Sequence, residues 1–169
     1  MKTRLAIMDD LPEIKNMYGE IVRNMMSNDI DIWDEIYPSE FFEDDIIYQQ
    51  LYVLINNINE IVAAFVLCQE NAGENAVTWQ ENNAKPCYID RFGVSVKHSR
   101  KGIGTIALNE AIRLSKEMKV EYLRLFVVDN NYPAVNLYQK MGFKRADGVY
   151  IEFIDDEISF DEIGYEMKL

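Results

Sequence analysis

A basic turn with two glycines has the residue types of an anion-binding site. A strand expected over 88–96 leads into a positively charged segment with Arg100 and Lys101, and Gly102 and Gly104 then open a predicted helix. The first N–H groups of a helix have no partner inside it, and the helix dipole favours negative charge at that end. Glycine lets the backbone approach a ligand closely, and the two cations add charge beside it. The pattern therefore predicts a turn that binds a pyrophosphate group.

The composition indicates one globular domain over residues 1–169 and argues against nucleic acid as a partner. The chain has 169 residues, 49% of them hydrophobic, which is enough for one substantial core. Its net charge is −12, whereas nucleic-acid binding relies on Lys and Arg residues that neutralise phosphates. In such an acidic protein, a positive turn indicates a local anion site.

The cysteines and the hydropathy predict a cytoplasmic protein that does not interact with a membrane. Cys68 and Cys87 have no paired spacing, so both are expected to be reduced thiols. The longest apolar run, 61–68, is far too short to cross a bilayer, and no long apolar segment precedes the acidic pair Asp9-Asp10 as a signal peptide would require. One His and two separated Cys supply neither a metal site nor a nucleophilic triad, so no metal is expected.

The hydrophobic pattern predicts a mixed α+β sheet. Apolar residues at helical spacing follow Asp10 and Glu13, which have the spacing of a capping box. Alternating and β-branched runs indicate strands, and glycine or proline marks the breaks. The predicted strands cover 2–8, 51–55, 61–69, 88–96, 122–128, 143–145, 150–154 and 163–168, and the predicted helices begin at about 11, 38, 104 and 134. Helices placed among strands in this order indicate one sheet.

The glycine turn also fits the dinucleotide-binding pattern of two glycines and a later Gly or Ala, so a nucleotide-binding oxidoreductase is a competing interpretation. A dinucleotide site needs an apolar strand that runs straight into the first glycine, and here the charged segment 97–101 intervenes. It also needs an acidic residue at the end of the following strand, which here ends in Val127-Val128 before Asp129. The remaining alternative for the glycines is a tight turn without a ligand, and the succession of strand, basic turn and helix favours phosphate binding.

A second block follows the strand at 122–128 and, together with the basic turn, resembles the GCN5-related N-acetyltransferase (GNAT) family. This block runs from Asn131 through Ala134 and Leu137-Tyr138 to Gly142-Phe143 and matches the family pattern Asn-x-x-Ala-x-x-Leu-Tyr-x-x-x-Gly-Phe. The Gln or Arg of the family's glycine signature falls on Ser99, with Arg100 one place later, so which of these two side chains contacts phosphate stays open. The resemblance implies an α+β fold of three layers, with a mixed, mostly antiparallel sheet of about seven strands, helices on both faces, and strands splayed at the acetyl-CoA site.

The resemblance implies acetyl-CoA as the co-substrate and names residues that would hold it. The end of the strand at 88–96 would pair its backbone with the pantetheine arm, and backbone N–H groups of the turn would hold the pyrophosphate. The implied cofactor-binding residues are Phe92, Gly93, Val94, Arg100, Lys101, Gly102, Ile103, Gly104, Thr105, Asn131, Ala134 and Tyr138.

The reaction that the family performs is direct attack of a neutral amine on the thioester, without a covalent enzyme intermediate. The Tyr138 hydroxyl would protonate the departing sulfur, and a backbone N–H near Val94 would stabilise the oxygen on which charge develops. The alternative for Tyr138 is a helix-packing aromatic. Asp90 is the candidate base, in competition with a structural carboxylate and with a water relay to Glu35 or another acid. His98 lies beside the turn and is expected to be a surface residue.

The acceptor-side segment carries Trp33, Glu35 and Tyr37 in an acidic stretch, and relatives place such a lid between the first two helices. These residues could hold a cationic amine by stacking and charge, and a solvated acidic face with two inward-packed aromatics is an equal alternative. A small cationic amine is therefore the expected acceptor. A CoA-binding sensor or scaffold with the same fold is the second hypothesis. Dimers are common among similar proteins, but the sequence carries no interface signal for a homodimer.

Overall fold

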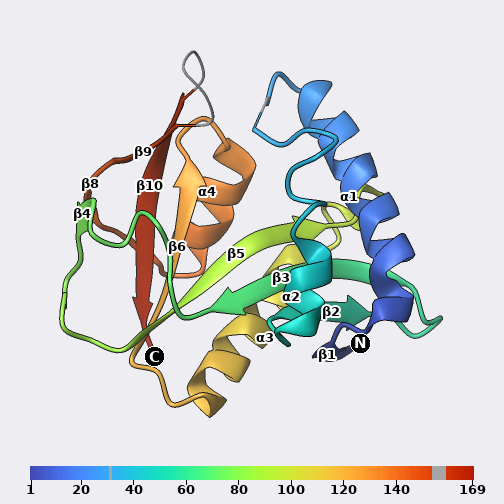
Figure 1. The fold of residues 1–169 in the computed structure, drawn as a ribbon, viewed down its shortest axis with the longest axis horizontal. Coiled ribbons are helices and arrows are strands. Elements are labelled where there is room, and N and C mark those ends of the chain that lie inside the picture. The colour runs from blue at the N-terminus through green and yellow to red at the C-terminus, as the bar shows by residue number, and fades with distance from the viewer. Residues whose placement is uncertain (31, 154–158) are drawn as a thin grey trace. The chain divides into compact units, whose positions relative to one another are not determined.

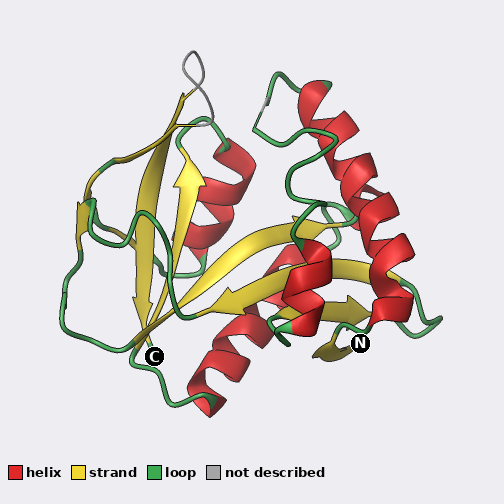
Figure 2. Ribbon diagram, in the orientation of Figure 1, coloured by secondary structure: helices red, strands yellow, loops and turns green. Residues whose placement is uncertain are grey.

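The computed structural model describes residues 1–30, 32–153 and 159–169 and divides the chain into two compact units. The first unit holds Met1–Leu67 and Arg91–Ala111, and the second holds Cys68–Asp90 and Ile112–Leu169. Each unit combines helices and strands, as Figures 1 and 2 show. The single domain expected from composition stays a prediction, and each unit is described by itself.

The first unit is an antiparallel sheet with helices. Strands β1 (Lys2–Leu5), β2 (Leu51–Ile55) and β3 (Ile61–Cys68) pair in that order. The end of β5 (Pro86–Val94) and the start of α3 (Ile103–Glu117) also belong to this unit. The other helices are α1 (Leu11–Met26), α2 (Phe42–Ile47) and two short 3-10 helices, Met8–Asp10 and Val96–His98.

Helix α1 buries the face that its sequence spacing predicts, because Ile14, Met17, Tyr18 and Ile21 are all buried. The predicted capping box is wrong. The Asp10 carboxylate accepts hydrogen bonds from Arg4 and from the backbone of Ile7, and α1 has no side-chain cap hydrogen bond. The Asp10 carboxylate thus binds a cation from β1 and does not cap α1.

The second unit is built on β10 (Ser159–Lys168), which pairs antiparallel with β6 (Tyr122–Val128) on one side. On its other side, β10 pairs with β7 (Lys144–Arg145) and β9 (Tyr150–Phe153). The first part of β5 pairs parallel with β6. Helix α4 (Tyr132–Lys140) and the rest of α3 complete this unit, together with the small pair of β4 (Val77–Thr78) and β8 (Asp147–Gly148).

The loop between β3 and β5 is fixed on the sheet of the second unit by Trp79. The Arg124 guanidinium lies 4.4 Å from the Trp79 ring centroid and donates to the Glu81 carbonyl at 2.7 Å. A Cβ on Gly164 would lie 2.9 Å from the Trp79 ring, so the indole needs a glycine beneath it. One face of this sheet is therefore partly covered by the loop.

The sequence-based element predictions agree with the structure except at several ends. The mixed, mostly antiparallel sheet with helices is confirmed, because β5 with β6 is the parallel pair among the described registers. Counted with β9, the paired strands around β5 number eight in the described residues, one more than expected. Strand 2–8 ends early and continues as a 3-10 helix, α2 is shorter than 38–50, and β10 begins at Ser159. Ile154, predicted to end a strand, lies outside the described residues.

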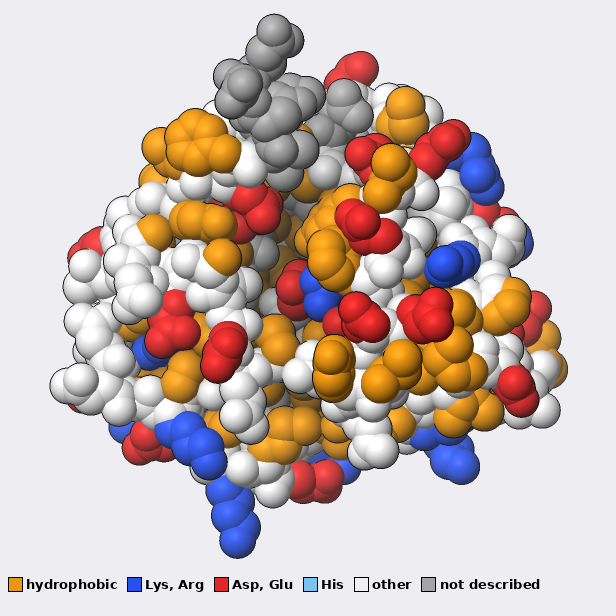
Figure 3. Space-filling view, in the orientation of Figure 1, with side chains coloured by type: hydrophobic (Ala, Val, Ile, Leu, Met, Phe, Trp, Pro, Cys, Tyr) orange, Lys and Arg blue, Asp and Glu red, His pale blue; other side chains and the backbone are white. Residues whose placement is uncertain are grey.

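No helix among the described residues is long and apolar enough to span a bilayer. The face of the molecule in Figure 3 carries many acidic and apolar side chains and few basic ones.

Candidate functional site

The glycine turn of the first unit has the backbone form that anion binding requires. Arg100 and Gly102 have φ angles of 58° and 78°, and α3 begins at Ile103. The N–H of Ile106 donates to the Gly102 carbonyl at 3.1 Å, so the N–H groups of residues 103–105 precede the first i→i−4 hydrogen bond. A Cβ on Gly102 would meet no heavy atom within 4 Å, which leaves open space beside the turn. A phosphate-bearing cofactor fits this arrangement.

The cations of the turn differ in what they contact. Lys97 pairs with Glu20 at 2.8 Å, and the Lys101 ammonium donates to the Lys97 carbonyl at 3.0 Å. Arg100 and Ser99 are both exposed, so the structure leaves open which of them contacts a phosphate. These side chains add positive charge beside the turn, and the backbone supplies the directed donors.

The end of β5 is irregular where the pantetheine arm is expected to pair. Arg91 has a φ of 48°, so the regular alternation of side chains that would place Asp90 and Arg91 on opposite faces does not apply here. The Tyr18 hydroxyl lies against the Arg91 carbonyl, and a Cβ on Gly93 would lie 2.7 Å from the Tyr18 ring. Gly93 is therefore required by the close approach of Tyr18, and Phe92 and Val94 flank it, partly buried.

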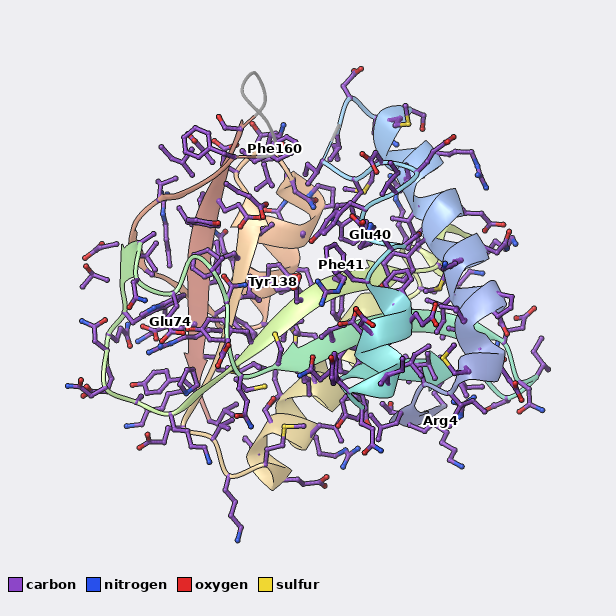
Figure 4. The ribbon with its side chains drawn as sticks, viewed as in Figure 1. Arg4, Glu40, Phe41, Glu74, Tyr138 and Phe160 are labelled. Atoms are coloured by element: carbon purple, nitrogen blue, oxygen red, sulfur yellow. The ribbon has the colours of Figure 1, made fainter. Side chains whose placement is uncertain are left out.

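The predicted acceptor residues of the first unit lie in an aromatic group. Trp33 and Tyr37 have ring centroids 6.5 Å apart, edge to face, and Trp33 also contacts Tyr18 at 5.6 Å. Phe41, labelled in Figure 4, packs against Tyr37 at 5.8 Å. Glu35 is exposed. These ring contacts give Trp33 and Tyr37 a structural role that needs no ligand. Their contact with an acceptor stays a prediction.

The second unit contains the phenol of the second motif block. Tyr138 lies on α4 (Figure 4), is 6% exposed, and packs against Phe143 at 5.9 Å between ring centroids. Asn131 caps the helix, because its side chain accepts from the Ala134 N–H at 3.4 Å. Burial, and then the charge of Asp90, raise the pKa of Tyr138 well above its ordinary value. The phenol therefore keeps its proton at neutral pH and lies within electrostatic reach of Asp90.

Two further carboxylates of the second unit interact with Asp90, and the sequence analysis did not single them out. Burial, followed by the charge of Asp90, raises the pKa of Glu152. Burial, followed by the charges of Glu152 and Asp90, raises the pKa of Glu162 to about 8. We call Asp90, Glu152 and Glu162 the acidic group. Among the described residues, no set of three His, Cys, Asp or Glu side chains has the spacing of a metal site.

The strand registers explain why these acids meet. Glu162 on β10 lies opposite Val128 of β6 and Tyr150 of β9, and Glu152 lies opposite Phe160, two residues before Glu162. Diagonal neighbours on adjacent strands share a face and interact. The alternation of the final strand could have indicated which of its acids faces inward, but its pairing with β9 could not be read from the sequence.

The parallel register of β5 with β6 ends at Ile89 opposite Leu125, whereas β6 continues to Val128. Asp90 follows the last paired residue directly. Two strands that splay apart must stop pairing at some residue, and the pairing of β5 with β6 stops here. That the two strands diverge beyond this point stays a prediction.

The chain matches the family model described as the Acetyltransferase (GNAT) family over residues 18–143. The matched region includes both the glycine turn and the second motif block. The chain belongs to the GNAT family.

Individual relatives agree with this assignment. An N-alpha-acetyltransferase of Sulfurisphaera tokodaii is 25% identical over 75% of this chain and 76% of its own length. One from Saccharolobus solfataricus is 24% identical over 82% of this chain and 89% of its own length. A GNAT-family acetyltransferase structure from Streptococcus agalactiae superposes with a TM-score of 0.78 over 99% of this chain and 95% of the other, at 16% identity, which supports the fold. The predicted GNAT fold and N-acetyltransferase class are therefore confirmed.

Proposed function

We propose that this GNAT N-acetyltransferase moves an acetyl group from acetyl-CoA to the primary amine of a small, positively charged acceptor. The observation that carries the proposal is the buried, protonated phenol of Tyr138 within electrostatic reach of Asp90, both of them inside the region that matches the family. A phenol and a carboxylate are the acid and the base that the transfer needs.

The donor would be held by the residues that the family resemblance implies. Backbone N–H groups from Arg100 to Thr105 would bind the pyrophosphate, and the backbone of 92–94 would pair with the pantetheine arm. Asn131, Ala134 and Tyr138 would line the rest of the arm. When bound, the co-substrate supplies an activated thioester carbonyl.

The chain's own groups would then manage protons and charge. The Tyr138 hydroxyl would donate its proton to the departing sulfur, and the N–H of Val94 would donate to the oxygen that gains charge. An acid beside Tyr138 would accept the proton of the ammonium, and Asp90 is the residue expected from the sequence.

A cationic acceptor is supported by the net charge of −12 and by the acidic group. Trp33, Glu35 and Tyr37 remain proposed contacts on the acceptor side. The α-amine of a protein N-terminus is a second candidate acceptor, because the two relatives from Sulfurisphaera and Saccharolobus bear the name N-alpha-acetyltransferase. We also propose a cytoplasmic location, because Cys68 and Cys87 do not have the paired spacing of a disulfide framework in the sequence.

The test of the function is Tyr138→Phe, with Tyr132→Phe as the matched control. Tyr132 lies on the same helix and is 68% exposed. We expect Tyr138→Phe to lower kcat about 100-fold with CoA affinity unchanged, and Tyr132→Phe to leave both unchanged. A wild-type protein that binds CoA but acetylates no amine would support the alternative of a CoA-binding sensor.

A panel of acceptors separates the two candidate substrates. It would contain polyamines, amino sugars, lysine-like amines, peptides with free N-termini, and neutral or anionic amines. Turnover of only the neutral or anionic amines would refute the cationic acceptor, and turnover of only the peptides would favour the protein N-terminus.

A further inference from the structure

Glu162 is an inward-facing carboxylate in the middle of the sheet of the second unit. It lies between β6 and β9, opposite Val128 of β6 and Tyr150 of β9. Because side chains alternate along a strand, it shares a face with Gly164 and Glu166 of the same strand. The loop that carries Trp79 covers this face at Gly164, and Gly73 of the same loop lies against Tyr150 and Phe126. The loop therefore reaches Tyr150, the residue opposite Glu162, and Glu162 itself is partly buried.

The titratable groups around Glu162 are acidic or neutral. Asp90 of β5 and Glu152 of β9 act on its charge, and Tyr150 of β9 lies opposite it. Tyr138 of α4 reaches Asp90. No Lys, Arg or His forms an ion pair with Glu162 in the part of the chain that the structure describes. Residues 31 and 154–158 are Asp, Glu and Ile only, so they add no cationic side chain.

Glu162 is partly buried, and a carboxylate that is withdrawn from water without a cation is costly to ionise; proteins retain such groups where they serve a function. We propose that Glu162 is the general base, the group that accepts the proton lost by the acceptor ammonium. This role rests on the proposed acetyl transfer. Asp90, whose charge acts on both Glu162 and the Tyr138 phenol, and Glu152 are positioning residues whose charges hold the proton on Glu162.

The proton step balances without another reactant. The N–H bond of the ammonium breaks, its electron pair stays on nitrogen as the lone pair of the neutral amine, and an O–H bond forms on the Glu162 carboxylate. Glu162 later returns this proton to water. The Tyr138 phenol serves the sulfur separately, so the two proton transfers use different groups.

The chemistry of Glu162 suits this step. A carboxylate with an ordinary pKa near 4.5 would be a poor acceptor for an ammonium proton, whereas burial and the neighbouring acids bring the pKa of Glu162 to about 8. An α-amine, the second candidate acceptor, has a pKa of about 8, so its proton transfer to this base is close to balanced, whereas a lysine-like amine with a pKa of about 10.4 gives up its proton less readily.

The test is the pH dependence of kcat/KM for the wild type, Glu162→Gln, Glu152→Gln and Asp161→Asn. Asp161 is the matched control, because it is exposed on the same strand one residue from Glu162. With a lysine-like amine as the acceptor, whose own pKa of about 10.4 lies well above this range, we expect for the wild type an ascending limb with its midpoint near pH 8. Glu162→Gln should abolish this limb and lower kcat/KM about 100-fold at pH 8, whereas Asp161→Asn should match the wild type.

Glu152→Gln supplies a readout that a structural role would not give. Removal of a neighbouring negative charge lowers the pKa of Glu162, so the limb should move to lower pH. The ammonium has the same pKa with every variant, so a shift between variants belongs to the protein. CoA affinity and the melting temperature identify any variant that fails to fold.

The outcomes are distinguishable. An active protein in which Glu162→Gln keeps the limb, or in which Asp90→Asn alone removes it, overturns the role of Glu162 and leaves the proposed function intact. A folded wild-type protein that acetylates no amine overturns the proposed function and this role together.

Discussion

Glu162 and Glu166 lie on the same strand and the same face, four residues apart, in opposite electrostatic settings. Glu166 is buried with Arg124, each side chain 1% exposed, and its carboxylate accepts from the Arg124 guanidinium at 3.4 Å and from the Gln80 N–H at 2.6 Å. Glu162 faces Asp90 and Glu152 instead. The charge of Glu166 is thus neutralised by a cation, whereas the charge of Glu162, nearer the other end of β10, is repelled by two other carboxylates.

This difference shows that the burial of a carboxylate does not by itself indicate whether the residue stabilises the protein. A buried carboxylate with a cation and a backbone donor fixes structure, here the loop that carries Trp79. A buried carboxylate among other acids lowers stability at neutral pH and is retained for another reason. The two settings therefore predict opposite effects when the negative charge is removed.

The largest expected effect on stability is at Glu166, the carboxylate that is paired with Arg124. Glu166→Gln should lower the free energy of unfolding by about 3–5 kcal/mol, because it leaves the Arg124 charge buried without its carboxylate. Urea unfolding at pH 7 measures this. Glu117→Gln, which removes an exposed pair with Arg113, should cost less than about 0.5 kcal/mol. Similar losses for both variants would contradict the structural role of Glu166.

Gly164 separates the two ends, and its replacement comes next in size. Gly164→Ala should destabilise the protein by about 2 kcal/mol at every pH, because the new Cβ would lie 2.9 Å from the Trp79 ring. If the variant Trp79→Leu together with Gly164→Ala recovers part of the loss, then the clash with the indole is the cause. An additive double variant would exclude that clash.

Glu162→Gln should have the opposite sign and a pH dependence. The pKa of Glu162 is raised in the folded state, so its stability cost is absent below pH 4.5, grows as pH rises, and is complete above about pH 8. Glu162→Gln should therefore stabilise the protein by about 2 kcal/mol at pH 9 and leave it unchanged at pH 4; this gain is smaller than the full pKa shift implies because the side chain is not fully buried. Urea titrations at both pH values measure it, and equal effects at the two values would be inconsistent with the opposed charge.

The smallest effect on stability is expected at the glycine turn. Gly102→Ala should cost about 1 kcal/mol, because the residue has a φ of 78° that alanine adopts poorly, although space for the methyl group is open. CoA affinity should fall with it when measured by isothermal titration. Lys101→Ala, which keeps the backbone, should weaken CoA less than Gly102→Ala does, and the reverse order would show that side-chain charge dominates there.

The sequence predicts the strand before the second motif block well and the acidic group poorly, for a physical reason. The strand over 122–128 and the motif from Asn131 to Phe143 are local patterns, and the structure has the same strand bounds. The capping-box prediction failed because the Asp10 carboxylate binds Arg4, and the second helix begins at Phe42 instead of near residue 38.

Glu162 could not be predicted from the sequence, because the electrostatic environment of its carboxylate depends on residues far away in the chain. Asp90 precedes it by more than seventy residues, and the β9–β10 register brings Glu152 diagonally opposite. Only the pairing of strands shows that these three acids share one neighbourhood.

The glycine turn is made of main-chain groups, and this has a consequence for how the protein can change over evolution. Because peptide N–H groups are the same in every residue, most side chains of the turn can drift while the donor is retained, as Ser99 at the family's Gln or Arg position illustrates. The proposed acceptor contacts Trp33, Glu35 and Tyr37 act through their side chains, so the acceptor preference can diverge by exchange of these residues. Selectivity should therefore be far easier to redesign in this enzyme than its dependence on a coenzyme.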